Sequence, residues 1–145
     1  MKIEKVDHIC FAVRNINEIK SKYLEYFGLS PSFEYSAESE KIRVVRYDIG
    51  GVGIEFIEPT DNDSEVAKFL SRKGEGPYLI AYKVDDLENA LEELRRKNVK
   101  LIDQSPRELF GAKYAFIQHP REFHGILTEL VEGEFKIPKK EGKER

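Results

Sequence analysis

The sequence contains no tryptophan and a single cysteine, and it has no long hydrophobic run. One cysteine excludes an internal disulfide framework, and Cys10 lies in a predicted buried strand, where we expect a small apolar side chain rather than a nucleophile. The opening stretch MKIEKVDHICFAV has only a short apolar run broken by charge, which fits neither a signal peptide nor a membrane span. We therefore expect a cytoplasmic protein that does not associate with membranes.

A strong charge of one sign is also missing, because the formal net charge is only -3. Without a basic field there is little to attract nucleic acid, and we expect no nucleic-acid partner. The 145 residues are 40% hydrophobic and 35% charged with mixed sign. Such a composition is typical of a globular chain with one core or two small fused cores.

Hydrophobic periodicity predicts two successive units with the same order of elements, a strand, a helix and three strands. In the first unit we expect a strand at 5–13, a helix that ends at Gly28, and strands at 31–36, 41–49 and 52–58, with Gly50-Gly51 as a hairpin turn. In the second unit we expect a strand at 77–84, a helix at 86–97, and strands at about 99–104, 112–118 and 125–132.

The offsets between the units support an internal repeat. Leu79 follows His8 by 71 positions, and Glu129 follows Glu55 by 74, so one loop absorbs the difference. We predict a single α+β domain over 1–132, made of module 1 (about 5–60), a linking helix (about 63–73) and module 2 (about 77–132). The charged tail, 133–145, has too little apolar content to pack and is expected to fray.

Two glutamates occupy equivalent places in otherwise apolar strands. Strand alternation puts Glu55 on the same face as Gly53 and Ile57, and it puts Glu129 on the same face as Leu127 and Val131. A carboxylate in an apolar row is unfavourable without a partner. One such glutamate could reach solvent at a strand end, but two in register indicate a functional site.

Several motifs together resemble the vicinal oxygen chelate (glyoxalase/bleomycin resistance) superfamily, and within it the methylmalonyl-CoA epimerases. They are VDHICFAV (6–13), IEFIEPTDNDSEVAKFL (54–70), YKVDDLENALEELRRKNVKLIDQSPR (82–107) and FIQHPREFHGILTEL (116–130). The resemblance spans nearly the whole chain. It implies that two βαβββ modules form a curved mixed-sheet cup, the glyoxalase fold, which holds a divalent metal ion.

The resemblance places the metal ligands at His8, Glu55, position 79 and Glu129. Position 79 is a histidine in the epimerases, whereas this sequence has Leu79. The remaining nitrogen and oxygen donors suit a divalent ion such as Co, Mn, Ni or Zn. We expect weaker metal binding, because the leucine side chain donates nothing.

Three other side chains near these strands are weaker ligand candidates. Strand alternation points Tyr78 away from position 79 and puts His124 out of phase with Glu129, unless a bulge rotates either residue. We expect His119 to cap a strand or to line the pocket rim rather than to bind metal.

The resemblance implies a metal-dependent proton-transfer isomerase that acts next to a thioester carbonyl. Glu55 and Glu129 are the predicted catalytic residues, facing one another across the substrate, and the sequence leaves open which is the base and which is a ligand. Two alternatives remain: a divergent, non-catalytic small-molecule-binding protein that lacks tight metal, and a glyoxalase I-like lyase. Without metal, His8 and the two carboxylates would hold either a shared proton or a protonated imidazole.

The expected partner is a small-molecule substrate, with an acyl-CoA as the candidate that the resemblance suggests, and family members of this kind often form homodimers. Phosphate groups of such a ligand would need cations near the pocket mouth. The candidates are Arg43, Arg46, Lys113 and Arg121.

Overall fold

The computed structural model describes residues 1–136, and its elements follow the predicted order closely. In chain order they are β1 (Ile3–Ala12), α1 (Ile16–Phe27), β2 (Phe33–Ala37), β3 (Ile42–Ile49), β4 (Val52–Pro59), α2 (Glu65–Lys73), β5 (Gly76–Val84), α3 (Leu87–Arg96), β6 (Arg107–Leu109), β7 (Ala112–Gln118), a 3-10 turn (Pro120–Glu122) and β8 (Leu127–Glu132). The predicted α+β class with two strand-helix-strand-strand-strand units is confirmed.

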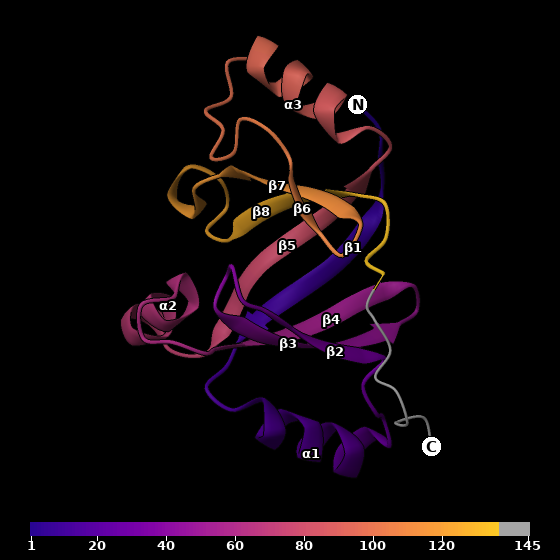
Figure 1. Ribbon diagram of the computed structural model, residues 1–145, viewed down its shortest axis with the longest axis vertical. Helices are drawn as coiled ribbons and strands as arrows, with labels where there is room; N and C mark the ends of the chain where they lie inside the picture. Colours follow the sequence, from indigo (N-terminus) through magenta and orange to yellow (C-terminus); the bar gives the residue numbers. More distant parts are fainter. Residues whose placement is uncertain (137–145) are drawn as a thin grey trace.

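All eight strands belong to one curved sheet, in the order β2-β3-β4-β1-β5-β8-β7-β6 (Figure 1). The two modules meet at its centre, where β1 and β5 pair antiparallel. Each central strand pairs parallel with the last strand of its own module, with His8 opposite Gly53 and Leu79 opposite Leu127. The sheet is therefore mixed, and its two halves are related by the internal repeat.

The predicted hairpin between β3 and β4 turns at Gly50 and Gly51. Both glycines have positive φ, 58° and 83°, the conformation that a tight two-residue hairpin turn requires. The turn fixes the β3–β4 register, in which Arg46 lies opposite Glu55. This register determines what surrounds the site.

The predicted strand at about 99–104 is wrong, and the corresponding strand of module 2 is the short β6. Asp103 interrupts the ladder with β7, because its carboxylate, rather than a backbone carbonyl, accepts the hydrogen bond from Phe116 N at 2.9 Å. Pro106 has no backbone N–H to donate. Regular pairing begins only at Arg107, opposite Tyr114.

Both repeated helices begin in the same way. The Asn15 side chain caps α1, and the Asp86 side chain caps α3. A glutamate from the end of the last strand of each module then accepts a further bond from the first helical N–H, Glu58 from Ile16 at 2.7 Å and Glu132 from Leu87 at 2.8 Å. These contacts tie each helix to its own half of the sheet.

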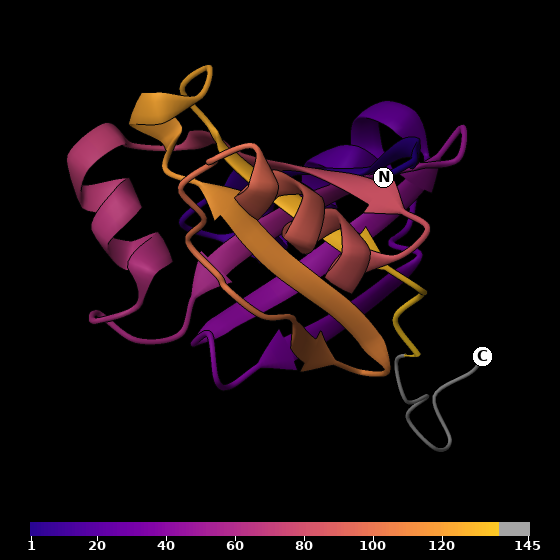
Figure 2. The same ribbon diagram turned by 90° about the horizontal axis from the view of Figure 1, so that it is seen from above.

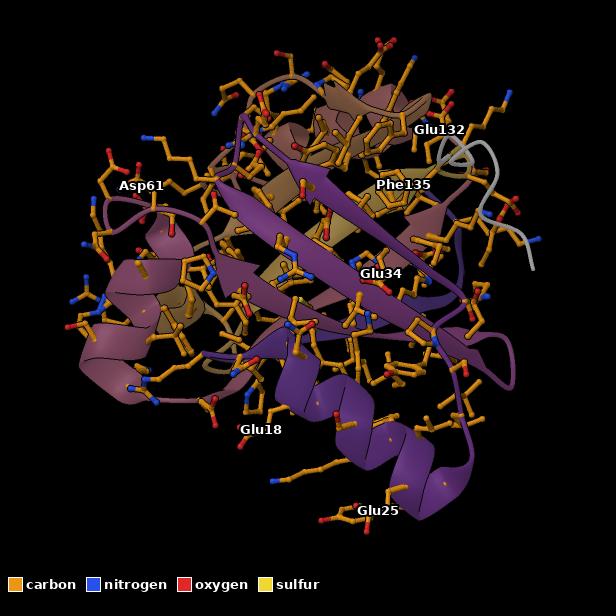
Figure 3. The ribbon with its side chains drawn as sticks, turned by 60° about the horizontal axis from the view of Figure 1, so that its bottom comes forward. Glu18, Glu25, Glu34, Asp61, Glu132 and Phe135 are labelled. Carbon is orange, nitrogen blue, oxygen red and sulfur yellow. The ribbon has the colours of Figure 1, made fainter. Side chains whose placement is uncertain are left out.

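The helices α1 and α3 lie at opposite ends of the molecule, on the outside of the sheet (Figures 1 and 2). In module 1 the core around α1 contains Tyr47 and Phe56, and in module 2 the core around α3 contains Leu91 and Leu130. Glu18, on α1, points away from the sheet (Figure 3). The inner face of the sheet is thus left for the site.

Two further segments border the inner face. The linking helix α2 packs beside β4 and β1, and its Phe69 ring meets Tyr78 edge-on at 5.0 Å. Phe135, from the segment that we expected to fray, lies 6.2 Å from the Tyr35 ring of β2 (Figure 3); positions 137–145 of that tail lie outside the described residues. No helix within residues 1–136 has the length and apolar composition needed to cross a membrane.

Candidate functional site

A cavity of about 770 Å³ occupies the inner face of the curved sheet. Its floor carries His8, Glu55 and Glu129, which are 3%, 4% and 5% exposed. Its walls are mainly apolar and include Tyr35, Val44, Ile57, Leu79, Phe116 and Leu127. Three ionisable groups in such surroundings need one another as partners.

The structure brings the three predicted site residues together. His8 Nε2 lies 3.2 Å from Glu129 Oε1 and 3.7 Å from Glu55 Oε1. On the other side of the ring, His8 Nδ1 lies 2.8 Å from Asp7 Oδ2. The imidazole therefore lies between the Asp7 carboxylate behind it, at Nδ1, and the Glu55 and Glu129 carboxylates in front of it, at Nε2.

The sheet topology explains this convergence. His8 lies on β1, between β4 of its own module and β5 of the other. On β4, Glu55 follows Gly53, the residue opposite His8, by two positions. On β8, Glu129 follows Leu127, the residue opposite Leu79, by two positions. Because side chains alternate along a strand, all four point to the inner face.

The charges within the cluster shift the pKa values of its members. Burial raises the pKa of Glu129, although His8 opposes this. Burial alone would lower the pKa of His8, but the charge of Glu55 and the bonds to Asp7 and Glu129 raise it well above its ordinary value. Despite burial, the pKa of Asp7 is lowered to about 2 by its hydrogen bond to His8 and by the charges of His8 and Arg46. These shifts favour the protonated form of the His8 imidazole, and Glu129 Oε1, 3.2 Å from Nε2, is placed to pair with it.

Arg46 belongs to this cluster, and our interpretation of it as a cation at the pocket mouth is wrong. Its side chain is buried, and Nη1 lies 3.1 Å from Glu55 Oε2 and 3.3 Å from Asp7 Oδ2. The alternation of β3 had placed Arg46 on the same face as Val44, which is the signal that could have identified it. Asp7 was also missed, although it directly precedes His8.

The other three predicted phosphate-binding cations differ in their position relative to the cavity. Arg43 pairs with Glu58 at 3.2 Å, and Lys113 does not line the cavity. Arg121 does line it. Sequence reasoning missed two more cations at the mouth, Arg72 and Lys73, which stand at the end of α2.

A polar bridge joins the modules at another edge of the cavity. Glu40 Oε2, between β2 and β3, accepts hydrogen bonds from Arg107 Nη1 at 3.1 Å and from the Tyr114 hydroxyl at 2.9 Å. The Arg107 guanidinium also lies 5.0 Å from the centre of the Phe116 ring. This contact closes the cup where the two hairpins approach.

At the position of the expected fourth ligand, Leu79 lines the cavity next to Cys10 on β1. The register of β1 and β5 shifts at Tyr78, because Cys10 faces Leu79 and Phe11 faces Pro77. This bulge turns Tyr78 toward the cavity, contrary to the simple alternation that we predicted, and burial raises the pKa of its hydroxyl to about 12.

The remaining histidines stand apart from the cluster. His119 lines the cavity, as expected, but its Nδ1 accepts a hydrogen bond from Arg121 N at 3.2 Å, so it caps the following 3-10 turn rather than the preceding strand. The ring nitrogen of His124 lies 3.4 Å from the Thr128 hydroxyl.

The donor set fits a divalent ion chemically, although it is incomplete. One imidazole nitrogen and two carboxylate oxygens, from His8, Glu55 and Glu129, are donors that Co, Mn, Ni or Zn accept. Among residues 1–136, however, no three His, Cys, Asp or Glu side chains are arranged as a ready-made metal centre. The donors instead bond to one another and to Arg46, and Leu79 contributes no donor. The metal site stays a prediction.

Comparison with known proteins identifies the class of protein that this fold and site define. The family model of the Glyoxalase/Bleomycin resistance protein/Dioxygenase superfamily matches residues 7–116. The chain therefore belongs to this superfamily, and the resemblance predicted from the motifs is confirmed.

Individual proteins within this superfamily are similar to the chain over most of its length. The chain is 39% identical to the uncharacterized protein YqjC of Bacillus subtilis (strain 168) over 131 residues, 90% of this chain and 93% of that protein. It is 28% identical to the mitochondrial methylmalonyl-CoA epimerase of Dictyostelium discoideum over 131 residues, 90% of this chain and 79% of that protein. A solved structure of a methylmalonyl-CoA epimerase in complex with methylmalonyl-CoA and NH4+ is similar with a TM-score of 0.81 and 29% identity, covering 90% of this chain and 95% of that one. The predicted glyoxalase fold is confirmed.

Proposed function

We propose that this chain is an isomerase that moves a proton at the carbon next to the carbonyl of an acyl thioester, in the manner of a methylmalonyl-CoA epimerase. One observation carries the proposal: Glu55 and Glu129 come from equivalent strands of two modules and flank His8 Nε2 on the floor of one cavity. Inversion at carbon needs a base on one face and an acid on the other. Similarity to the epimerases supports the same chemistry.

The two carboxylates have different partners, which suggests different roles. Glu55 is held by Arg46 and accepts the proton when the carbon-hydrogen bond breaks. Glu129 shares a proton with His8 and returns it to the opposite face of the carbon. The reverse reaction uses the same groups in exchanged roles. No net proton is gained or lost.

The rest of the cavity suits a charged thioester with a small acyl group. Apolar walls exclude water from the floor, which strengthens the interactions between charges there. Arg72, Lys73 and Arg121 at the mouth would attract the phosphate groups of a CoA-like ligand. The homodimer implied by the family resemblance belongs to the same proposal.

In a metal-bound form, His8, Glu55 and Glu129 would hold the predicted divalent ion, with the Nε2 proton of His8 released, because only a neutral imidazole binds metal. When bound, such an ion supplies positive charge that stabilises the enolate oxygen. The chain's own residues position the substrate and transfer its proton.

The test is hydrogen exchange at C2 of methylmalonyl-CoA in deuterated water, followed by NMR, with and without added cobalt. We expect exchange by the natural protein and a loss of about 100-fold or more in the rate of inversion at C2 in Glu129→Gln, because the amide cannot return a proton to the opposite face, whereas exchange without inversion can continue through Glu55. Glu132→Gln is the matched control, because Glu132 lies on the same strand but bonds to the N–H of Leu87 outside the cavity.

Two results would overturn the assignment. Inversion at full rate in Glu129→Gln would remove that residue from the chemistry. Binding of methylmalonyl-CoA without exchange under either metal condition would support a non-catalytic binding protein, the reading that Leu79 favours.

A further inference from the structure

Arg46 is the one arginine in residues 1–136 whose guanidinium reaches the carboxylate cluster. Its Nη1 contacts Glu55 and Asp7, its Nη2 donates to the Asp7 carbonyl at 3.2 Å, and its Nε donates to Asp48 Oδ1 at 2.8 Å. All donors of the planar group that face the protein therefore have partners. Such a fork holds its partners in one geometry.

The fold leaves a space for this guanidinium. A side chain on Gly53 would begin 2.3 Å from Arg46 Cζ, so any residue with a Cβ would displace the group. The Phe33 ring lies 5.7 Å away on another side. The equivalent of Gly53 in module 2 is Leu127, and the residue opposite Glu129 is Phe116. The space for a cation is thus built in one module only.

Arg46 does not line the cavity. It contacts Glu55 in front of His8 and Asp7 behind it, and both of these contact the imidazole. Its influence on the floor must therefore pass through the two carboxylates. Its positive charge offsets part of the negative charge that Asp7, Glu55 and Glu129 place around His8.

We propose that Arg46 is a positioning residue that acts as a built-in cation of this site. It fixes the Glu55 carboxylate and supplies charge compensation that a divalent ion would otherwise supply, so the site binds divalent ions more weakly than the same donors would without it. The inference rests on the proposed roles of His8, Glu55 and Glu129. Like charges repel strongly in a water-poor cavity, which is why a fixed guanidinium beside a ligand carboxylate disfavours a second cation.

Cobalt titration tests this directly, by calorimetry and by the visible absorption of bound cobalt. We expect Arg46→Gln to bind cobalt about tenfold more tightly or better, because the amide keeps a hydrogen bond to Glu55 but carries no charge. Arg46→Lys keeps the charge and should stay within about threefold of the natural protein. Arg43→Gln, on the same strand, removes an arginine that pairs with Glu58 outside the cavity and should change nothing.

A second variant covers the case in which Arg46→Gln does not fold. Gly53→Ala leaves the arginine in the chain but displaces its guanidinium, and we expect a cobalt affinity between those of the natural protein and Arg46→Gln. Cobalt binding that is unchanged or weaker in every folded variant, Arg46→Gln or Gly53→Ala, would overturn the proposal.

Proton exchange on methylmalonyl-CoA provides the functional readout. We expect kcat to fall in Arg46→Gln with little change in KM, because Arg46 does not touch the substrate, and we expect partial recovery of kcat in Arg46→Lys. A rise in KM with no change in kcat would contradict a positioning role. If the natural protein shows no exchange, the proposed function fails, and the cobalt affinities still decide the role of Arg46.

Discussion

Modules 1 and 2 have the same strands in the same order, but their inner faces carry different chemistry. Three pairs of equivalent positions show the difference: His8 and Leu79 on the central strands, Arg46 and Phe116 opposite the glutamates, and Gly53 and Leu127 beside them. Only the glutamates, Glu55 and Glu129, are shared. The polar half of the floor is built by module 1, and the apolar half by module 2.

This asymmetry teaches which parts of the repeat the fold requires. The capping residues and the core positions are equivalent in the two modules, because each helix must begin and pack on its own half-sheet. The inner face has no such requirement. One half can hold charges while the other excludes water, and a reacting carbon between them would meet two different carboxylates.

Making module 1 resemble module 2 should have the largest effect on stability. Arg46→Phe leaves Asp7 and Glu55 buried without their cation, and we expect the free energy of unfolding to fall by about 3–5 kcal/mol. Urea denaturation at neutral pH measures it.

Arg43→Phe, on the same strand, is the matched control. Arg43 pairs with Glu58 at a partly exposed site, so its loss should lower the free energy of unfolding by about 1 kcal/mol or less. Equal losses of free energy in the two variants would show that the ion pairs of Arg46 stabilise the fold no more than an exposed ion pair does.

Asp7 should make the contribution of module 1 to the free energy of unfolding depend on pH in acid, unlike its equivalent in module 2. Its folded pKa of about 2 lies below the ordinary 3.8, so its ionised form stabilises the fold above pH 3.8, and this stabilisation is lost as the pH falls through 2. We expect the loss to be about 2 kcal/mol. The equivalent residue in module 2 is Tyr78, whose pKa is raised and which does not titrate there.

The measurement is the free energy of unfolding between pH 5 and pH 2 for the natural protein, Asp7→Asn and Tyr78→Phe. The curve for Asp7→Asn should fall less steeply, whereas Tyr78→Phe should keep the natural slope. Parallel curves for all three proteins would remove Asp7 as the source of the acid dependence.

Restoring the missing donor in module 2 should strengthen metal binding. Leu79→His adds an imidazole at the position equivalent to His8, and we expect cobalt affinity to rise by about tenfold, equivalent to about 1.4 kcal/mol. Leu79→Phe has a ring without a donor and serves as the control. The same affinity in both variants would mean that position 79 no longer faces the donors.

The sequence predicted the fold and half of the site, for identifiable reasons. A pattern of strand and helix periodicities that repeats at an offset of 71 to 74 positions is enough to predict two modules and to bring Glu55 and Glu129 to one face. The partner of Glu55 was missed, because a charged residue on a strand is most often solvated. Its alternation with Val44 was the one signal in the sequence, and the space beside Gly53 exists only in three dimensions. The bulge at Tyr78 was considered but not predicted, because alternation alone gives no sign of an extra residue.

The smallest effect tests what the modules share. Glu58 and Glu132 accept hydrogen bonds from the first N–H groups of α1 and α3, and each carboxylate also lies at the positive end of its helix. We expect Glu132→Ala to lower the free energy of unfolding by about 1 kcal/mol, and Glu58→Ala by the same amount or slightly more, because Glu58 also pairs with Arg43. Thermal and urea denaturation of the two variants gives both values. Similar losses would show that the two modules remain equivalent where the backbone requires it, whereas a loss in one module only would mean that the asymmetry of the site extends to the helices.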